Sequence, residues 1–183
     1  MVLRGAVDLD TADRWFAALI DEVPWRQDHI VIAGRRHRVP RLQAWIADAG
    51  VRYTYSNIAL SPMPWTPTLR ETRALVEGAA STPFNSVLVN RYRNGADSVA
   101  WHADDEPELG PAPIIGSLSL GATRTLQLRR CADPHDRRAV VLHGGDVAVM
   151  RPPTQQGWHH RVPKTTVPVG ERINLTFRTV FGR

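Results

Sequence analysis

The stretch Arg172–Arg178, with the sequence RINLTFR, alternates without interruption between polar and apolar side chains. Because successive side chains of a β-strand point to opposite faces, this pattern predicts a strand with one face on an apolar core. The other face carries two arginines and no acidic residue that would neutralise them. We therefore expect this face to bind an anionic ligand, with the arginines at different ends of the site because they lie roughly 20 Å apart along a strand.

From residue 84 onward, the chain consists of short apolar or alternating runs that are separated by Pro, Gly and Asn. This pattern is typical of an all-β region. Gly144 and Gly145 lie between two of the runs and predict a hairpin turn. The predicted strands cover residues 87–89, 114–120, 125–128, 140–142, 147–150 and 173–177.

Helical signals precede the strands. Asp10 is a candidate N-cap for a helix over residues 11–22, in which apolar residues recur at helical spacing until a proline. Thr66 followed by Pro67 predicts the start of a second helix that ends before residues 81–83. Helices followed by many short strands indicate an α+β fold, with the helices packed on one side of an antiparallel sandwich or jelly roll.

The composition restricts the class of protein. The length of 183 residues suits a single domain. The chain contains no run of about 18 apolar residues and no apolar N-terminal stretch behind basic residues, so we expect neither a membrane span nor a secreted precursor. The single cysteine, Cys131, cannot form an internal disulfide and fits a reducing compartment. We therefore predict a cytoplasmic protein.

The net charge of +5 comes almost entirely from arginine, because Lys164 is the only lysine. Arginine binds phosphate through two parallel hydrogen bonds and suits a nucleic-acid partner, but a coding bias towards arginine explains the composition equally well. Basic residues crowd positions 35–41 and acidic residues crowd positions 104–108. The charge is therefore segregated along the chain.

A candidate metal site consists of the His-x-Asp motif at His102 and Asp104 together with a later histidine. Side chains two residues apart on an extended backbone project from the same face, so these two can share one ion. A second imidazole completes the two-histidine, one-carboxylate set that suits non-haem Fe(II), although the same set also suits zinc. His159 and His160 are adjacent and would face opposite ways, so we expect only one of them to bind metal.

These motifs, in this order, resemble the AlkB-type Fe(II)/2-oxoglutarate-dependent dioxygenases, which repair alkylated nucleic acid. The resemblance covers about residues 51 to 180, and the ordered combination is far more specific than any single motif. It implies one domain over residues 1–183, with N-terminal helices and a substrate-binding lid in 1–83 and a double-stranded β-helix, or jelly roll, in 84–183. The matching residues are 90–92 (NRY), 102–106 (HADDE), 117–121 (SLSLG), 158–160 (WHH) and 174–178 (NLTFR).

The resemblance implies that His102, Asp104 and His160 bind iron, with 2-oxoglutarate and molecular oxygen as cosubstrates. His160 is preferred over His159 because the family histidine lies two residues after a tryptophan-like position and shortly before a proline. These three ligands, together with Arg178, would be the catalytic residues.

The resemblance also implies how 2-oxoglutarate is bound. Arg172 would bind its distal carboxylate with support from Tyr92 and Asn174, because a guanidinium holds a carboxylate through two parallel hydrogen bonds. Asn90 and Arg178 would lie nearer the metal-bound end of the cosubstrate.

For the substrate, Tyr53 and Tyr55, next to Ser56, resemble family aromatics that line the pocket of a flipped base. Stacking on such rings stabilises a base by about 1 to 3 kcal/mol, although two tyrosines at this spacing are otherwise one face of a strand. Asp105 is expected to accept a hydrogen bond from an exocyclic amine, and Glu106 to orient neighbouring groups. The alternative is that this acidic cluster is a solvated loop.

Residues 30–38 predict a hairpin with an apolar arm, a small pair at the turn and a basic return arm that carries Arg35, Arg36 and Arg38. The basic arm suits phosphate binding, and an ordinary solvated loop is about as compatible with the residues alone. Family members that act on duplexes resemble this layout but place a bulky wedge at the tip, where this chain has Ala33. We therefore expect a preference for single-stranded or locally melted substrate.

The function that the resemblance implies is oxidative dealkylation of bases such as 1-methyladenine and 3-methylcytosine in DNA or RNA. We also expect a monomer without a membrane partner. A base inside a duplex must be flipped out before it can reach the iron. One alternative is the same oxidation of a protein or small-molecule substrate. Two others are a non-catalytic nucleic-acid binder and a zinc hydrolase.

Overall fold

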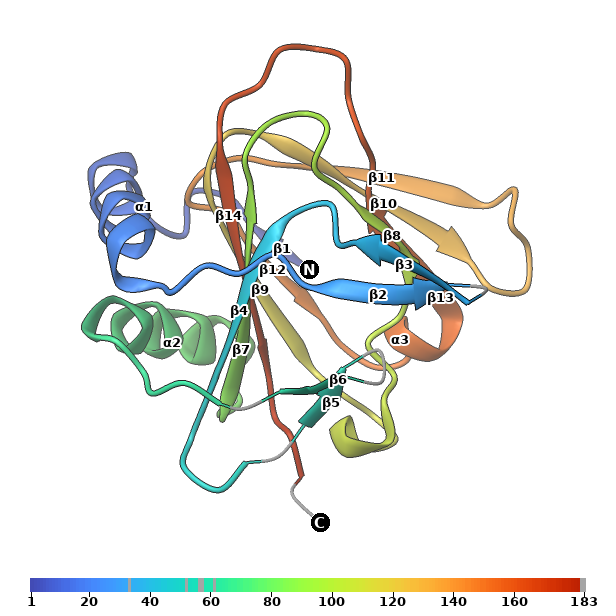
Figure 1. The fold of residues 1–183 in the computed structure, drawn as a ribbon, viewed down its shortest axis with the longest axis horizontal. Coiled ribbons are helices and arrows are strands. Elements are labelled where there is room, and N and C mark those ends of the chain that lie inside the picture. Colours follow the sequence, from blue (N-terminus) through green and yellow to red (C-terminus); the bar gives the residue numbers. More distant parts are fainter. Residues whose placement is uncertain (33, 52, 56–57, 61, 182–183) are drawn as a thin grey trace.

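The computed structural model describes residues 1–32, 34–51, 53–55, 58–60 and 62–181, and the side chains of residues 32, 53–55 and 58–60 lie outside this description. Within it, two large antiparallel sheets pack face to face (Figure 1). The main sheet has the order β1-β12-β9-β14-β7-β4, and the second sheet has the order β11-β10-β13-β8. This arrangement confirms the expected jelly roll.

The main sheet is built from β1 (Val2–Leu3), β4 (Leu42–Ala47), β7 (Ser86–Tyr92), β9 (Ile115–Gly121), β12 (Val147–Met150) and β14 (Arg172–Arg178). The second sheet is built from β8 (Val99–His102), β10 (Arg124–Arg130), β11 (Arg137–Leu142) and β13 (Trp158–Val162). Two short helical elements are α3 (Thr154–Gly157) and a 3-10 turn, η1 (Pro107–Leu109).

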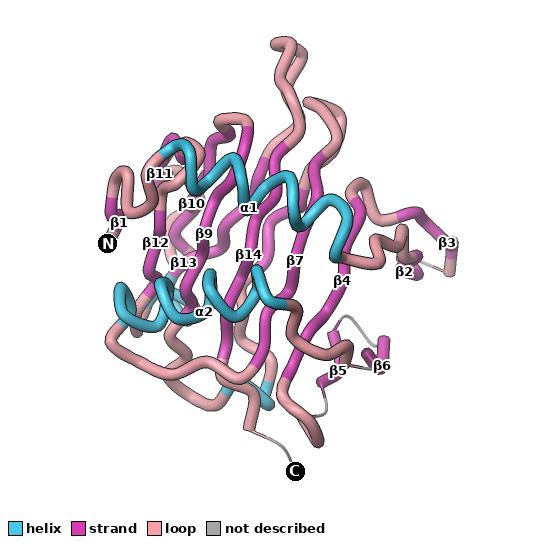
Figure 2. Tube along the Cα trace, turned by 90° about the vertical axis from the view of Figure 1, so that its left-hand side faces the viewer, coloured by secondary structure: helices cyan, strands magenta, loops and turns pink. Residues whose placement is uncertain are grey.

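Two long helices lie across the outer face of the main sheet, as Figure 2 shows. Helix α1 (Leu9–Glu22) begins two residues earlier than expected, because Asp8 and not Asp10 is its N-cap: the Asp8 carboxylate accepts a hydrogen bond from the Thr11 amide. Helix α2 (Pro67–Ala80) begins as predicted, with the Thr66 hydroxyl accepting from the Leu69 amide. The apolar sides of both helices pack on the sheet.

Strand β14 lies between β9 and β7, and both of its faces are buried. Its apolar residues Ile173, Leu175 and Phe177 belong to the core beneath the helices. Its polar residues face the second sheet, where Asn174 and Arg178 line an internal cavity. The predicted alternation is confirmed, but the polar face lies inside the sandwich.

The chain before residue 84 contributes more to the sheets than expected. Strands β1 and β4 extend the main sheet at its two edges, so the sandwich is not confined to residues 84–183. The hairpin predicted at Gly144 and Gly145 is wrong: β11 pairs with β10, whereas β12 pairs with β9 and β1. The two glycines instead carry the chain from one sheet to the other, and a local pattern of apolar runs does not distinguish these connections.

Two hairpins lie beside the sandwich, on the side that faces the viewer in Figure 1. Strands β2 (His29–Ile32) and β3 (Arg35–Arg38) form the predicted basic hairpin, with Ile32 opposite Arg35. Strands β5 (Tyr53–Tyr55) and β6 (Ile58–Leu60) form the other. No helix in the described part of the chain is long and apolar enough to cross a bilayer.

Gly116 of β9 permits the close approach of α2 to the sheet. A Cβ atom at this position would lie 2.4 Å from a Val76 methyl group and 3.1 Å from the Phe84 ring. We predict that Gly116→Ala lowers the free energy of unfolding by about 1 to 3 kcal/mol, because the core must shift to admit the methyl group.

The matched control is Gly78→Ala on the exposed side of α2, where an added Cβ contacts nothing. This change should raise the free energy of unfolding by up to about 1 kcal/mol, since alanine is the better helix former. Urea denaturation measures both values. An unchanged Gly116→Ala variant would show that α2 does not pack tightly at this point.

Candidate active site

Two histidines meet where strands β8 and β13 pair in the second sheet. His102 and His160 are direct partners across the two strands, and their ring centroids are 4.2 Å apart. The neighbouring His159 points the other way, with its Nδ1 3.9 Å from the Cys131 sulfur. The alternation of β13 thus selects His160 for the interior, as expected.

Asp104 completes the group from the loop after β8. Its carboxylate is fully buried, with Oδ1 4.0 Å from His102 Nε2 and Oδ2 3.8 Å from His160 Nε2. The backbone amide of Asp104 donates to the side chain of buried Gln155 on α3 (2.9 Å), which fixes the turn. One candidate ligand atom from each of the three side chains lies within 4.8 Å of the others, a spacing that can hold one metal ion.

The histidine nitrogens are arranged to accept a metal. His102 Nδ1 lies 2.9 Å from the Ala100 carbonyl oxygen, which only accepts hydrogen bonds, so Nδ1 carries the proton. Its Nε2 therefore presents a lone pair towards Asp104. A backbone carbonyl behind a metal-binding histidine commonly fixes the tautomer and the ring in this way.

Burial and neighbouring charges determine the protonation states of His102, Asp104 and His160. Burial lowers the pKa of His160 to about 4, with the neighbouring His102 adding to the effect, and burial also lowers the pKa of His102. Burial raises the pKa of Asp104, but the Arg178 guanidinium and the two histidines outweigh it and bring that pKa to about 2. At neutral pH the site offers two neutral imidazoles and one carboxylate.

Arg178 is anchored to the metal group. Its Nη2 donates to Asp104 Oδ1 at 2.6 Å, across 74 positions of sequence. The polar face of β14 itself carries no acidic residue, but Asp104 from a distant segment supplies an acidic partner for Arg178. This contact places Arg178 at the metal end of the cavity.

Arg172 lies at the other end of β14 and is 1% exposed. Its Nη2 donates to the Ser119 hydroxyl (2.9 Å), and its guanidinium carbon lies 5.2 Å from the centre of the Tyr92 ring. Among the described residues, its Nε and Nη1 have no hydrogen-bond partner. A buried guanidinium with two unused N–H groups fits an anionic ligand such as a carboxylate.

Between these ends lies a cavity with a polar lining. Asn90 accepts a hydrogen bond from the buried Arg41 (Nε to Oδ1, 2.6 Å), and Asn174 donates to the Ser117 hydroxyl (2.8 Å). The structure thus brings Asn90, Tyr92 and Asn174 to one cavity with the histidines, as predicted. Its polar lining consists of Arg41, Asn90, Tyr92, His102, Asp104, Ser117, His160, Asn174, Thr176 and Arg178.

The roles of several residues at the site were not predicted from the sequence. Arg41 was grouped with the basic stretch 35–41, but its side chain is buried in the cavity. Ser117 belongs to a strand whose serines alternate with apolar residues, a pattern that identifies a polar face once the neighbouring strand is known. The contact of Gln155 with Asp104 depends on a turn that the sequence does not reveal.

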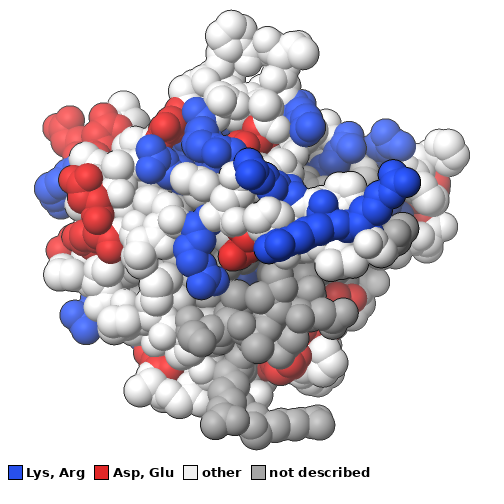
Figure 3. Space-filling model, in the orientation of Figure 1, with Lys and Arg blue, Asp and Glu red and all other residues white. Residues whose placement is uncertain are grey.

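The residues predicted to contact substrate lie nearer the surface. Arg35, Arg36 and Arg38 are exposed on β3, and Figure 3 shows basic side chains gathered in a stripe over this hairpin. Asp105 is exposed and Glu106 is half-buried. Ala33 and Ser56 lie outside the described residues, as do the side chains of Tyr53 and Tyr55, so their predicted roles stay predictions.

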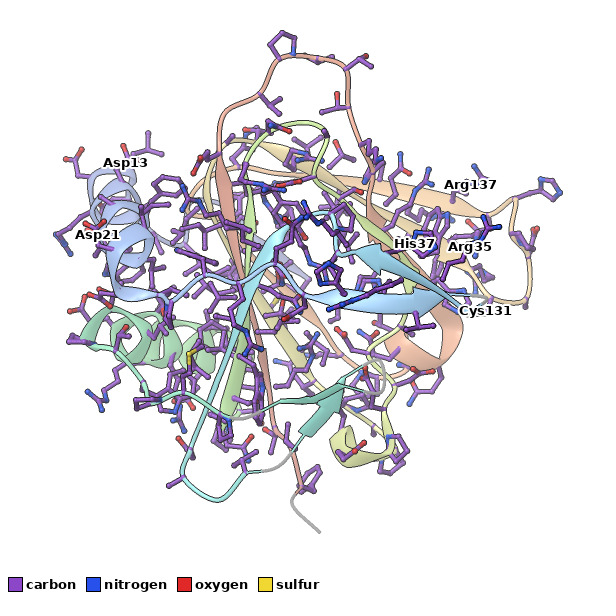
Figure 4. The ribbon with its side chains drawn as sticks, in the orientation of Figure 1. Asp13, Asp21, Arg35, His37, Cys131 and Arg137 are labelled. Atoms are coloured by element: carbon purple, nitrogen blue, oxygen red, sulfur yellow. The ribbon has the colours of Figure 1, made fainter. Side chains whose placement is uncertain are left out.

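A pocket joins the basic hairpin to the metal group. It is lined by Ile30, His37 and Arg38 from the hairpin, by residues 39–41 that follow the hairpin, and by residue 98 and part of β8, including His102. Figure 4 labels Arg35 and His37, which both lie on this hairpin. A ligand held by the hairpin can therefore extend towards His102.

Comparison with protein families decides the class of this site. The family model described as the 2OG-Fe(II) oxygenase superfamily matches residues 1–178. A human DNA oxidative demethylase, ALKBH2, is 40% identical over 179 residues, which cover 92% of this chain and 69% of that protein. The chain belongs to the AlkB-type 2OG-Fe(II) oxygenases.

Other relatives support the assignment to this family. The human protein named alpha-ketoglutarate-dependent dioxygenase alkB homolog 3 is 42% identical over 186 residues, or 97% of this chain, and the chain spans 64% of its length. The solved structure of OsALKBH1 superposes with a TM-score of 0.66 at 17% identity and covers 98% of this chain, which supports the fold. The AlkB-type cofactors are Fe(II), 2-oxoglutarate and oxygen, and the donor set described above fits them.

We predict that His102→Ala, Asp104→Ala and His160→Ala each weaken Fe(II) binding by more than about 100-fold, since even the loss of an indirect partner commonly costs 10- to 100-fold. Calorimetric titration under anaerobic conditions measures the affinity. The matched control is His159→Ala, which should retain the metal. Loss of the metal in that variant, with retention in His160→Ala, would reverse the assignment.

Proposed function

We propose that this chain removes alkyl groups from nucleobases of DNA or RNA by oxidation, as direct-reversal repair of lesions such as 1-methyladenine and 3-methylcytosine. The observation that carries the proposal is the pocket between the basic hairpin and His102, because it connects an exposed basic surface to the metal group. The names of the relatives, a DNA oxidative demethylase and an alkB homolog, support the same substrate class.

In this proposal, His102, Asp104 and His160 hold the iron, and Arg178 keeps Asp104 ionised. Arg172 binds the distal carboxylate of 2-oxoglutarate beside Tyr92 and Asn174, while Asn90 and Arg178 lie nearer the metal-bound end. When bound, Fe(II) with 2-oxoglutarate and oxygen supplies an oxidant for the alkyl carbon, and the hydroxylated product loses an aldehyde.

The chain's own residues orient the cosubstrate and exclude water. Arg172 is desolvated before the ligand arrives, so little reorganisation is needed when a carboxylate binds. The cavity between the sheets keeps Asp104 and His160 away from bulk water, whereas His102 is partly exposed. The pocket beside His102 is the route by which a flipped base would enter. Tyr53, Tyr55 and Ser56 are proposed to line the base, with Asp105 and Glu106 beside it.

The decisive experiment supplies the protein with Fe(II), 2-oxoglutarate and an oligonucleotide containing one 1-methyladenine. We expect succinate and restored adenine to appear in equal amounts, and both to disappear in His102→Ala. An unmethylated oligonucleotide is the control for uncoupled turnover.

The alternatives give different outcomes. Succinate formation that responds to a protein or small-molecule substrate but not to the methylated oligonucleotide would favour the same chemistry on another substrate. Oligonucleotide binding without succinate would indicate a non-catalytic binder, and hydrolysis supported by zinc alone would indicate a hydrolase.

We further propose that the natural substrate is single-stranded or locally melted, and that the protein acts as a cytoplasmic monomer. The proposal on strandedness is supported by the small side chain of Ala33, which the sequence predicts at the hairpin tip, since a methyl group fills little of the gap left by a flipped base. Repair of one lesion should be faster in a single strand than in a duplex, and Ala33→Phe should improve the duplex rate. Faster repair of the duplex by the unmodified protein would refute this preference.

The basic hairpin should provide salt-sensitive affinity. We predict that Arg35→Ala and Arg38→Ala each weaken oligonucleotide binding and reduce the slope of log affinity against log salt by about one per lost phosphate contact. Fluorescence anisotropy at several salt concentrations measures both quantities. Arg70→Ala on exposed α2 is the control and should leave the slope unchanged. Equal effects of all three changes would point to overall charge as the cause.

A further inference from the structure

Arg124 is a buried arginine that none of the roles above includes. It begins β10 in the second sheet, and the residue is 4% exposed. Its Nη1 donates to the Asn94 carbonyl (3.2 Å), and its Nη2 donates to the carbonyls of Asp97 (2.9 Å) and Pro163 (2.6 Å). One guanidinium therefore ties the loop after β7 and the segment after β13 to the start of β10.

The same guanidinium lies beside the proposed carboxylate-binding end of the cavity. Its central carbon is 5.5 Å from the centre of the Tyr92 ring, and that of Arg172 is 5.2 Å from the same centre. Tyr92 is also the direct strand partner of Arg172. The buried guanidinium groups of Arg124 and Arg172, which come from opposite sheets, thus both lie close to the Tyr92 ring.

This pair of cations has little local compensation. Asp97 is the carboxylate beside Arg124, but both of its oxygens accept hydrogen bonds from Arg93 (2.8 and 2.9 Å). The pKa of Arg172 is lowered mainly by burial, which the charge of Arg124 reinforces and Tyr92 opposes. A buried cation without an anionic partner is unfavourable. A ligand carboxylate at this end would lower the free-energy cost of burying both arginines.

A purely structural role is the competing explanation, because the three carbonyl bonds hold two loops in place. A neutral donor such as glutamine, however, can still donate to two of these carbonyls without carrying a charge. The two explanations differ in one respect. A loop anchor affects every ligand of the cavity equally, whereas a charge acts on the ligand's distal carboxylate.

We infer that Arg124 is a specificity-determining residue, which selects a 2-oxo acid with a distal carboxylate by placing a second positive charge behind Tyr92 and Arg172. It acts through position and charge without lining the cavity itself. The inference rests on the proposed role of Arg172 at this end of the cavity.

The test compares two ligands that differ at one end: 2-oxoglutarate and 2-oxopentanoate, which has a methyl group in place of the distal carboxylate. Their dissociation constants are measured by calorimetry with Mn(II) in place of iron and without oligonucleotide, so no turnover is involved. We expect Arg124→Gln to weaken 2-oxoglutarate roughly tenfold, because it removes one full charge near the carboxylate, and to change 2-oxopentanoate less than about twofold. Equal weakening of both acids would overturn the inference.

Arg124→Lys is the second variant, and it separates charge from folding. It keeps the charge but cannot reproduce the three-carbonyl fork, so its melting temperature should fall while the preference for 2-oxoglutarate stays within about threefold of the unmodified protein. A preference that falls with the melting temperature would count against the inference, even if Arg124→Gln does not fold. Arg129→Gln, on the outer face of the same strand against Trp101, is the matched control and should leave the preference unchanged.

Arg172→Gln distinguishes failure of this inference from failure of the underlying assignment. If it abolishes the preference while Arg124→Gln does not change it, only the role of Arg124 is wrong. If neither variant changes the preference, the carboxylate end of the cavity has been placed incorrectly.

Discussion

Strand β14 is buried on both faces. One face requires apolar surroundings and the other requires polar surroundings. Its backbone is paired with β7 over its whole length and with β9 from Arg172 to Phe177, so it cannot rotate or shift by one residue without exchanging the two faces. Its apolar side chains lie beneath the helices, and its polar side chains lie between the sheets. The positions of the helices, the second sheet and the cavity all follow from this division.

The interior between the sheets is consequently rich in cations. Arg41, Arg124, Arg172 and Arg178 are all buried, and of these Arg178 forms a direct ion pair with a described carboxylate, Asp104. Burying charge is unfavourable unless it is paired, so such a cavity retains its shape at a cost in stability that an anionic ligand offsets. Binding of 2-oxoglutarate and folding should therefore be coupled in this family member.

The sequence was sufficient for features that depend on local alternation. The pattern of residues 172–178 predicts both faces of β14, and the adjacency of His159 and His160 predicts that only one points inwards. Features that depend on pairing between distant segments were not predictable in this way. The contact of Arg178 with Asp104, the burial of Arg41 and the crossing of the chain between sheets at Gly144 and Gly145 each depend on which strands become neighbours. Local propensity does not contain that information.

The distribution of surface charge has a consequence for how a partner approaches. Asp13 and Asp21 are exposed on α1, on the opposite side of the molecule from Arg35 and His37 in Figure 4. The acidic helix and the basic hairpin thus give the protein an electric dipole. A polyanion would be repelled by one side and attracted by the other, so the protein would be turned towards it before the two touch. Part of the orientational search would then be completed in solution, at a rate that falls as ionic strength rises.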